Sequence, residues 1–412
     1  MIDRILHPLV VYRKALFFAF LVVLILYRSP SLFSEPRFYG EEGSNFFTFA
    51  YSHSWLHGLV VPAISYYSFF LNFSCVLAAK CVPLIYAPFV TTYLSLLLTL
   101  APIVLVLWGR SLFFDTPLKQ GIICLGTLFF SPGEIWISTT CSQFYLCLIT
   151  FLILIQDVNA LNFFQRWFYR IALGVAAMSG VLSCFLAPFF LMKYRHDRSR
   201  ENRIQMVIVT CLSIAQFSIC ALFVLFGPNT TRFQSADLRF TVLNYFYSHF
   251  LYPLFGQYMG TRYLVFIKRE EWWSSGFIGL SAIFIAYIVF AFIMFASTLK
   301  DRNKRVIIYS FLIVSILSTL LSIQMVSGPR YGFMPNIVLA IITLSQIDFK
   351  SRSAWIRVKS VICTVLIFTS LVVGAVEFRY RLIPYSDETW PKWREEITKW
   401  EENHRYPIKI WP

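Results

Sequence analysis

Long apolar segments recur along almost the whole chain and constrain its fold more than any other feature. A helix needs about 20 apolar residues to cross the roughly 30 Å hydrocarbon core of a bilayer. Several apolar segments of the chain approach or exceed that length, and the full set is 15–27, 84–108, 120–131, 140–156, 204–226, 276–298, 306–324, 334–347 and 360–376. They predict an all-α integral membrane protein, a polytopic bundle of about 10–12 transmembrane helices.

The composition supports this fold class. Of the 412 residues, 58% are hydrophobic and only 14% are charged, whereas soluble domains average about 25% charged residues. So few charges would not cover the surface of a soluble protein of this length. The nine cysteines fall mostly within apolar segments, without CxxC or Cys/His spacing. They indicate neither a zinc site nor a disulfide framework.

The net charge of +15 comes largely from short loops between the apolar segments. Three of these loops, 193–203, 300–305 and 350–359, are strongly basic. Because cytoplasmic loops of membrane proteins retain positive residues, we place these loops and the N-terminus inside. Residues 1–376 then form the transmembrane bundle, and the outer regions are the loops 28–83 and 227–275 and the tail 377–412. We expect no nucleic-acid partner, because no long basic tail is present.

Two topologies fit the first half of the chain. In one, residues 60–80 form a full span, which puts Arg110, Lys119, Arg166 and Arg170 outside. In the other, 60–80 is a juxtamembrane helix and 171–192 is a hairpin broken near Ser179-Gly180, which keeps these cations inside. The positive-inside pattern favours the second topology.

The first outer loop contains two adjacent carboxylates, Glu41 and Glu42, between Gly40 and Gly43. A carboxylate there could act as a general base, and the glycines allow a tight turn. The alternative is a solvated pair of charges at a helix N-terminus. The alternation of aromatic and polar residues over 44–57 predicts an interfacial amphipathic helix, capped by Ser44 or Asn45.

That helix would place His53 and His57 one turn apart. This spacing suits a metal, but a third ligand is missing from the pattern. We therefore predict no metal site, and consider the two histidines as candidate substrate-binding residues.

Further candidates lie in later outer segments. Glu134 precedes a polar run, Ser138–Gln143, which could face a cavity; helix packing through small hydroxyls is the alternative. Arg330-Tyr331 follows Ser327-Gly-Pro, and arginine suits phosphate, although interfacial snorkelling also explains it. The basic loop 227–275 adds Arg232 and Arg262 and suggests an anionic partner such as a lipid phosphate. The spans carry almost no ionisable residues, which argues against an ion-coupled transporter.

Taken together, these segments resemble the GT-C class of membrane glycosyltransferases, mostly in layout and along the whole chain. The matching features are Glu41-Glu42-Gly43 with the 44–57 helix and Pro62, Glu134 to Gln143, Arg330-Tyr331, and a tail with Trp390, Trp393, Trp400 and Ile410-Trp411-Pro412. Two departures are that many members have Asp in the first-loop motif, and that no large soluble domain follows the bundle here. The resemblance therefore does not indicate the acceptor.

The resemblance implies an enzyme of the bacterial inner membrane. It would move a sugar from a polyprenyl-phosphate donor to a glycan or glycolipid acceptor of the cell envelope, at the periplasmic face. Glu42 or Glu41 would be the base, and Arg330, Tyr331 and Arg262 would bind the donor phosphate. Glu134, Gln143, His53, His57 and Arg232 would be substrate-binding residues. It implies no required cofactor, although some members of the class use a divalent ion, which Glu41-Glu42 could hold.

Three other function classes remain open. A lipid-linked-glycan transporter or flippase would move its substrate without covalent change, and would favour a charged central cavity. A polysaccharide polymerase would share the outer arginines and usually has a large late outer loop. A non-enzymatic scaffold would need none of these residues.

Overall fold

A computed structural model describes residues 2–61, 66–226, 242, 245–258, 260, 275–301, 304–321, 329–379 and 392–410. These residues are mainly helical, and Ser68 and Ser179 form an isolated antiparallel bridge. The prediction of an all-α protein is therefore confirmed for the part of the chain that the structure describes. Arg232 and Arg262 lie outside these ranges.

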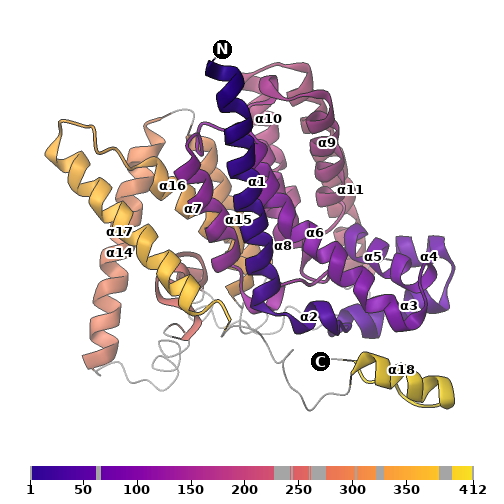
Figure 1. Ribbon diagram of the computed structural model, residues 1–412. Coiled ribbons are helices and arrows are strands. Elements are labelled where there is room, and N and C mark those ends of the chain that lie inside the picture. Colours follow the sequence, from indigo (N-terminus) through magenta and orange to yellow (C-terminus); the bar gives the residue numbers. More distant parts are fainter. Residues whose placement is uncertain are drawn as a thin grey trace.

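The long helices form two groups that lie side by side (Figure 1). The first group is α1 (Ile2–Arg28), α6 (Ala87–Trp108), α7 (Pro117–Phe129), α8 (Ser142–Leu154), α9 (Phe163–Ala177), α10 (Ala187–His196) and α11 (Arg200–Phe226). The second group is α14 (Ser275–Leu299), α15 (Arg305–Leu321), α16 (Phe333–Ser345) and α17 (Ala354–Val376). We call the end of the bundle where α1 finishes the Arg28 end, and the other the opposite end.

Among the residues that the structure describes, three helices are long and apolar enough to cross a membrane: Leu84–Trp108, Arg200–Phe226 and Ala354–Val376. By contrast, α8 and α16, which match the predicted spans 140–156 and 334–347, have 13 residues each. A helix of that length rises only about 20 Å, less than the thickness of the hydrocarbon core. Nearly all of their residues are buried. They are core helices, packed on all sides by other parts of the chain.

In the first half of the chain, the described part of 60–80 does not form one long helix. Within 60–80, the helix α5 (Phe69–Lys80) has 12 residues and packs on other helices of the first loop, so it is not a full span. The helix α9 ends at Ala177, and Gly180 has φ +114° before the short helix η5 (Ser183–Leu186) and α10. The predicted break at Ser179-Gly180 is therefore present, although the hairpin begins earlier, at Phe163. The connections from α10 to α11 and from α16 to α17, which contain the basic stretches 193–203 and 350–359, lie at the opposite end (Figure 1).

The predicted single helix over 44–57 is wrong. The chain instead forms a π-helix, η1 (Glu42–Phe47), followed by α3 (Thr48–Ser52) and α4 (Trp55–Val60). Neither Ser44 nor Asn45 caps a helix, because the helical segment already begins at Glu42. Ser54 caps α4 by accepting a hydrogen bond from the backbone N–H of His57. Alternation of polar and apolar residues did not reveal this break.

Part of the predicted outer loop 227–275 is also placed differently. Residues 245–258 are helical and include a π-helix, η7 (Tyr247–Leu251), whose residues are all buried. The ring of Phe250 packs edge-on against Phe311 of α15, with centroids 5.5 Å apart. These residues therefore belong to the core of the bundle, because their aromatic side chains pack between helices.

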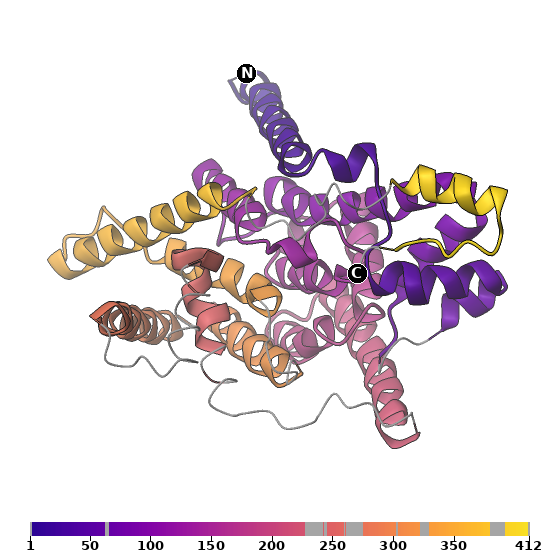
Figure 2. The same ribbon diagram turned by 90° about the horizontal axis from the view of Figure 1, so that it is seen from below.

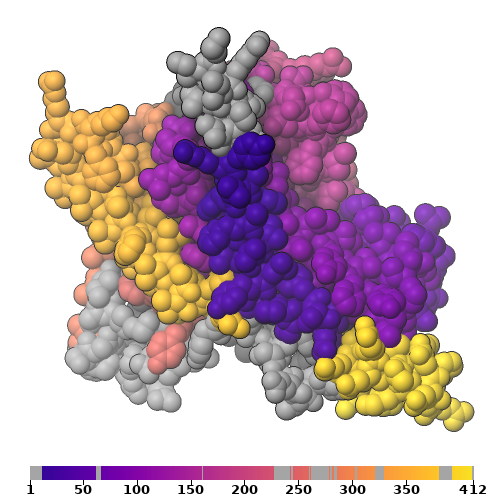
Figure 3. All heavy atoms as spheres, viewed as in Figure 1, coloured from indigo at the N-terminus to yellow at the C-terminus, as the bar shows by residue number. Residues whose placement is uncertain are grey.

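The C-terminal helix α18 (Trp393–Glu402) packs on the first-loop unit, which we define as the helices from α2 (Ser31–Ser34) to α5. Views from the side and from below both show α18 beside this unit (Figures 1 and 2), and its atoms lie against the unit's surface (Figure 3). Trp393 packs edge-on against Phe38, with ring centroids 5.2 Å apart. A second hydrophobic core, separate from that of the bundle, therefore joins the predicted tail to the first outer loop.

Candidate functional site

Glu42 is a buried carboxylate at the Arg28 end, and only 4% of it is exposed. It follows a turn in which Gly40 has φ +47°, a left-handed conformation that glycine adopts without strain. The rings of Phe38 and Phe47 stack beneath this turn with centroids 4.2 Å apart. Its neighbour Glu41 is exposed. The packing of the first-loop unit therefore separates the two adjacent glutamates into a buried one and a solvated one.

Neutral groups hold the Glu42 carboxylate. The Thr139 hydroxyl donates a hydrogen bond to Oε1, and the backbone N–H of Tyr39 donates to Oε2 over 3.3 Å. Burial raises the pKa of Glu42 to about 7, because the charged form loses its hydration, and these hydrogen bonds only partly oppose that effect. The carboxyl group is therefore set to exchange a proton near neutral pH.

Thr139 belongs to an irregular segment, 131–141, that connects α7 to α8. In this segment Ile137 has φ +48°, an unusual conformation for a β-branched residue that costs about 1–3 kcal/mol. The next residues, Ser138 and Thr140, join their hydroxyls over 2.6 Å. The helix predicted over 140–156 starts only at Ser142, so most of the polar run lies on this strained segment. Backbone strain of this kind is concentrated at functional sites.

Arg28 anchors the same segment. It is 1% exposed, and its guanidinium donates to the carbonyl oxygens of Leu128 at 3.3 Å and Ser131 at 2.9 Å. It also lies 4.0 Å from the ring centroid of Trp136. Sequence reasoning missed this residue, because an arginine directly after an apolar segment is the ordinary flank of a membrane helix. Arg28 thus positions the loop that contains Thr139.

Arg330 contacts the same segment, 131–141, at Glu134. Its Nε lies 3.7 Å from Glu134 Oε2, and its guanidinium lies 5.3 Å from the ring centroid of Tyr331. The Tyr331 ring in turn packs edge-on against Phe144 of α8, with centroids 5.4 Å apart. The Arg330 side chain is 40% exposed. Two motifs that lie almost 200 residues apart in the sequence therefore meet at the start of α8.

A tight contact holds the Arg330 turn in place. The turn is the short helix η8 (Pro329–Gly332), and a Cβ added to Gly332 would lie 2.0 Å from the Ser248 carbonyl oxygen. That carbonyl also accepts a hydrogen bond of 3.1 Å from the Asn336 amide. Any side chain at position 332 would push the turn away from η7. Gly332 is thus a residue on which the placement of Arg330 depends.

The remaining predicted site residues that the structure describes are Gln143, His53 and His57. Gln143 donates a hydrogen bond of 3.4 Å to the Tyr66 hydroxyl. His53 is exposed and stacks on Phe49 with ring centroids 3.9 Å apart, and the exposed His57 shares a 3.0 Å hydrogen bond with Ser54. The break between α3 and α4 separates the two histidines, so they do not share one helix as predicted. Their role in substrate binding stays a prediction.

Glu42 and Arg330 thus both contact the segment 131–141 and Tyr331 contacts the start of α8, whereas Glu41 faces solvent. Within the described ranges, no group of three His, Cys, Asp or Glu side chains is arranged to hold a metal ion. Comparisons with protein-family models, with curated proteins and with solved structures give no match for this chain.

Proposed function

We propose that the protein is a membrane glycosyltransferase that moves a sugar from a polyprenyl-phosphate donor to a glycan or glycolipid acceptor of the cell envelope. The observation that carries this proposal is the convergence of a buried carboxyl group, Glu42, and an arginine, Arg330, on segment 131–141. Acid–base chemistry and stabilisation of a phosphate are the two tasks that this transfer requires.

In the proposed reaction, the Glu42 carboxylate accepts the proton of an acceptor hydroxyl. The hydroxyl oxygen attacks the anomeric carbon of the donor sugar and forms the new glycosidic bond. The bond between that carbon and the phosphate oxygen breaks, and the lipid phosphate leaves with the electron pair. Arg330 stabilises the negative charge that grows on the leaving phosphate. The scheme uses no metal ion.

The structure distinguishes the two glutamates as candidates for the base. A general base works best when its pKa lies near the working pH, and burial raises the pKa of Glu42 to about 7. Glu41 is exposed and lies at the N-terminal end of η1. We therefore assign the proton transfer to Glu42 and treat Glu41 as its matched control.

We further propose that the Arg28 end faces the periplasm of a bacterial inner membrane. The connections from α10 to α11 and from α16 to α17, which contain the basic stretches 193–203 and 350–359, lie at the opposite end (Figure 1). Cytoplasmic loops are the ones enriched in lysine and arginine. This orientation puts Glu42 and Arg330 on the side where lipid-linked sugars are used.

The direct test is a transfer assay with purified protein in detergent, a labelled polyprenyl-phosphate sugar and envelope glycolipid as acceptor. Glu42→Gln should lower the rate by about 10²–10⁴-fold, the usual contribution of a general base. Glu41→Gln, which removes the same charge one residue away, should stay within about threefold of wild type because it does not lie in the proton path.

Arg330→Gln and Arg330→Lys extend the test to the phosphate. Lysine keeps the positive charge but lacks the planar guanidinium group. The transfer rate of Arg330→Lys should therefore lie between those of Arg330→Gln and wild type. Equal activity of Glu42→Gln and wild type would contradict the assignment of the base. Movement of intact donor across liposomes without transfer would instead indicate a flippase.

A further inference from the structure

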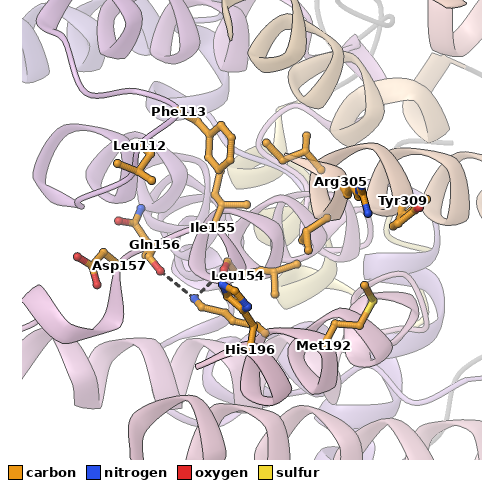
Figure 4. Close-up of a pocket in the computed structure, with 13 residues that line it drawn as sticks. Leu112, Phe113, Leu154, Ile155, Gln156, Asp157, Met192, His196, Arg305 and Tyr309 are labelled. Atoms are coloured by element: carbon orange, nitrogen blue, oxygen red, sulfur yellow. Dashed lines mark hydrogen bonds between the residues drawn. The ribbon is translucent and has the colours of Figure 1, made fainter. Parts of the chain in front are cut away.

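A cavity of about 510 Å³ is lined by residues that follow α6 and α8, by the last turn of α10 and by the first turns of α15. These helix ends lie at the opposite end of the bundle (Figure 1). Figure 4 shows Arg305 and Tyr309 of α15 on one side of it and Leu112, Phe113 and Ile155 on the other, with Met192 and His196 of α10 below. A volume of this size suits part of a lipid or a small ligand.

The lining combines an apolar wall with basic side chains. The apolar members are Leu112, Phe113, Leu154, Ile155, Met192, Val306 and Ile307. The charged or titratable members are Lys193, His196 and Arg305, together with a single carboxylate, Asp157. With His196 neutral, the lining has two positive charges and one negative charge. Its chemistry therefore matches a molecule with an anionic head and an apolar tail.

Lys193 holds its ammonium at the end of α8. Nζ donates to the carbonyl oxygens of Leu154 at 2.7 Å and Gln156 at 2.8 Å. An ammonium has three N–H donors, so within the described ranges one donor is left for an acceptor in the cavity. Arg305 is exposed, and its Nε donates to the Leu299 carbonyl oxygen at 2.7 Å. The planar guanidinium still offers its terminal nitrogens to an anion.

We propose that this cavity binds an anionic phospholipid, with its phosphate at Lys193 and Arg305 and one acyl chain along the apolar wall. Basic pockets between helices at the cytoplasmic side of membrane proteins suit such head groups. The apolar wall favours a lipid over free phosphate, since Leu112 (78% exposed) and Met192 (41% exposed) would otherwise meet water. The site lies among the basic loops and is independent of the sugar transfer proposed above.

The test measures lipid retention by native mass spectrometry of the full-length protein from micelles containing phosphatidylglycerol or phosphatidylcholine. Wild type should retain phosphatidylglycerol preferentially. Arg305→Gln should weaken that retention about tenfold, because an ion pair with the phosphate is lost. Arg352→Gln is the matched control, since Arg352 is exposed at the same end and does not line the cavity.

A second variant tests the space instead of the charge. Met192→Trp should fill the cavity and reduce retention of phosphatidylglycerol while the charge of the lining is unchanged. Equal retention of both lipids by wild type, or equal loss in Arg305→Gln and Arg352→Gln, would overturn the proposal. So would the same rise in the thermal unfolding midpoint with inorganic phosphate alone as with phosphatidylglycerol. None of these readouts depends on sugar transfer.

Discussion

The buried Glu42 carboxylate and the partly buried Lys193 ammonium, at opposite ends of the bundle, are held in similar ways but have different roles. At the Arg28 end, the Glu42 carboxylate is bound by the Thr139 hydroxyl and the Tyr39 N–H. At the opposite end, the Lys193 ammonium is bound by the carbonyl oxygens of Leu154 and Gln156. In both cases the hydrogen-bonding partners are neutral groups.

The two sites differ in whether the hydrogen-bonding partners would otherwise be unsatisfied. The carbonyls at the end of α8 have no further turn of helix to bind them, so Lys193 completes their hydrogen bonding and stabilises the fold. The partners of Glu42 are a side-chain hydroxyl and a loop N–H. Burial disfavours the charged form of both groups: it raises the pKa of Glu42 to about 7 and lowers the pKa of Lys193 to about 8. We infer that Lys193 contributes to stability, whereas Glu42 lowers stability at neutral pH and is retained for its chemistry.

The largest expected effect on stability is the pH dependence that Glu42 causes. Its pKa rises from 4.5 in the unfolded chain to about 7 in the fold, so between these values the folded state binds more protons. Stability therefore falls as pH rises from about 4.5 to 7 and levels off above that. Between pH 5 and pH 8 this loss is roughly 2–3 kcal/mol.

Glu42→Gln should remove that loss, because the amide stays neutral. The measurement is the thermal unfolding midpoint in detergent at pH 5 and pH 8 for wild type and variant. At pH 8 the unfolding midpoint of the variant should be higher than that of wild type. The variant should nevertheless lose sugar transfer. An equal pH dependence in the two proteins would show that Glu42 is not buried as described.

A smaller effect of opposite sign is expected at Lys193. Lys193→Met leaves the Leu154 and Gln156 carbonyls without their donor, which should lower the unfolding free energy by about 2 kcal/mol. Lys350→Met, at an exposed lysine of the same end, serves as the control and should change little. The measurement is made without anionic lipid. An unchanged unfolding free energy in Lys193→Met would show that Lys193 does not stabilise the fold.

The smallest effect concerns Thr139. Thr139→Ala removes a hydrogen bond to the charged form of Glu42, so the pKa of Glu42 should rise further. The midpoint of the pH–rate profile should move upward by about one pH unit, and Thr139→Ser should restore it because serine keeps the hydroxyl. A profile that moves equally in both variants would show that the threonine methyl group, and not its hydrogen bond, positions the carboxylate.

The tertiary structure corrected the sequence predictions where contacts between distant segments decide the outcome. Polar–apolar alternation over 44–57 could not show that Ser54 begins a new helix. The apolar character of 140–156 predicted a span, but α8 is a short core helix because other helices cover it. Arg28 looked like an ordinary flank, and its role depends on Trp136 and Ser131, more than 100 residues away.

The sequence by itself determined the helical class, the positions of the long apolar helices and the charged end of the bundle. These follow from the length of apolar segments and the placement of lysine and arginine, which are local properties. Only the tertiary structure decided that Glu42 is buried while Glu41 is exposed, and that Arg330 meets Glu134. The physical reason is that burial and pairing depend on packing between segments far apart in the chain.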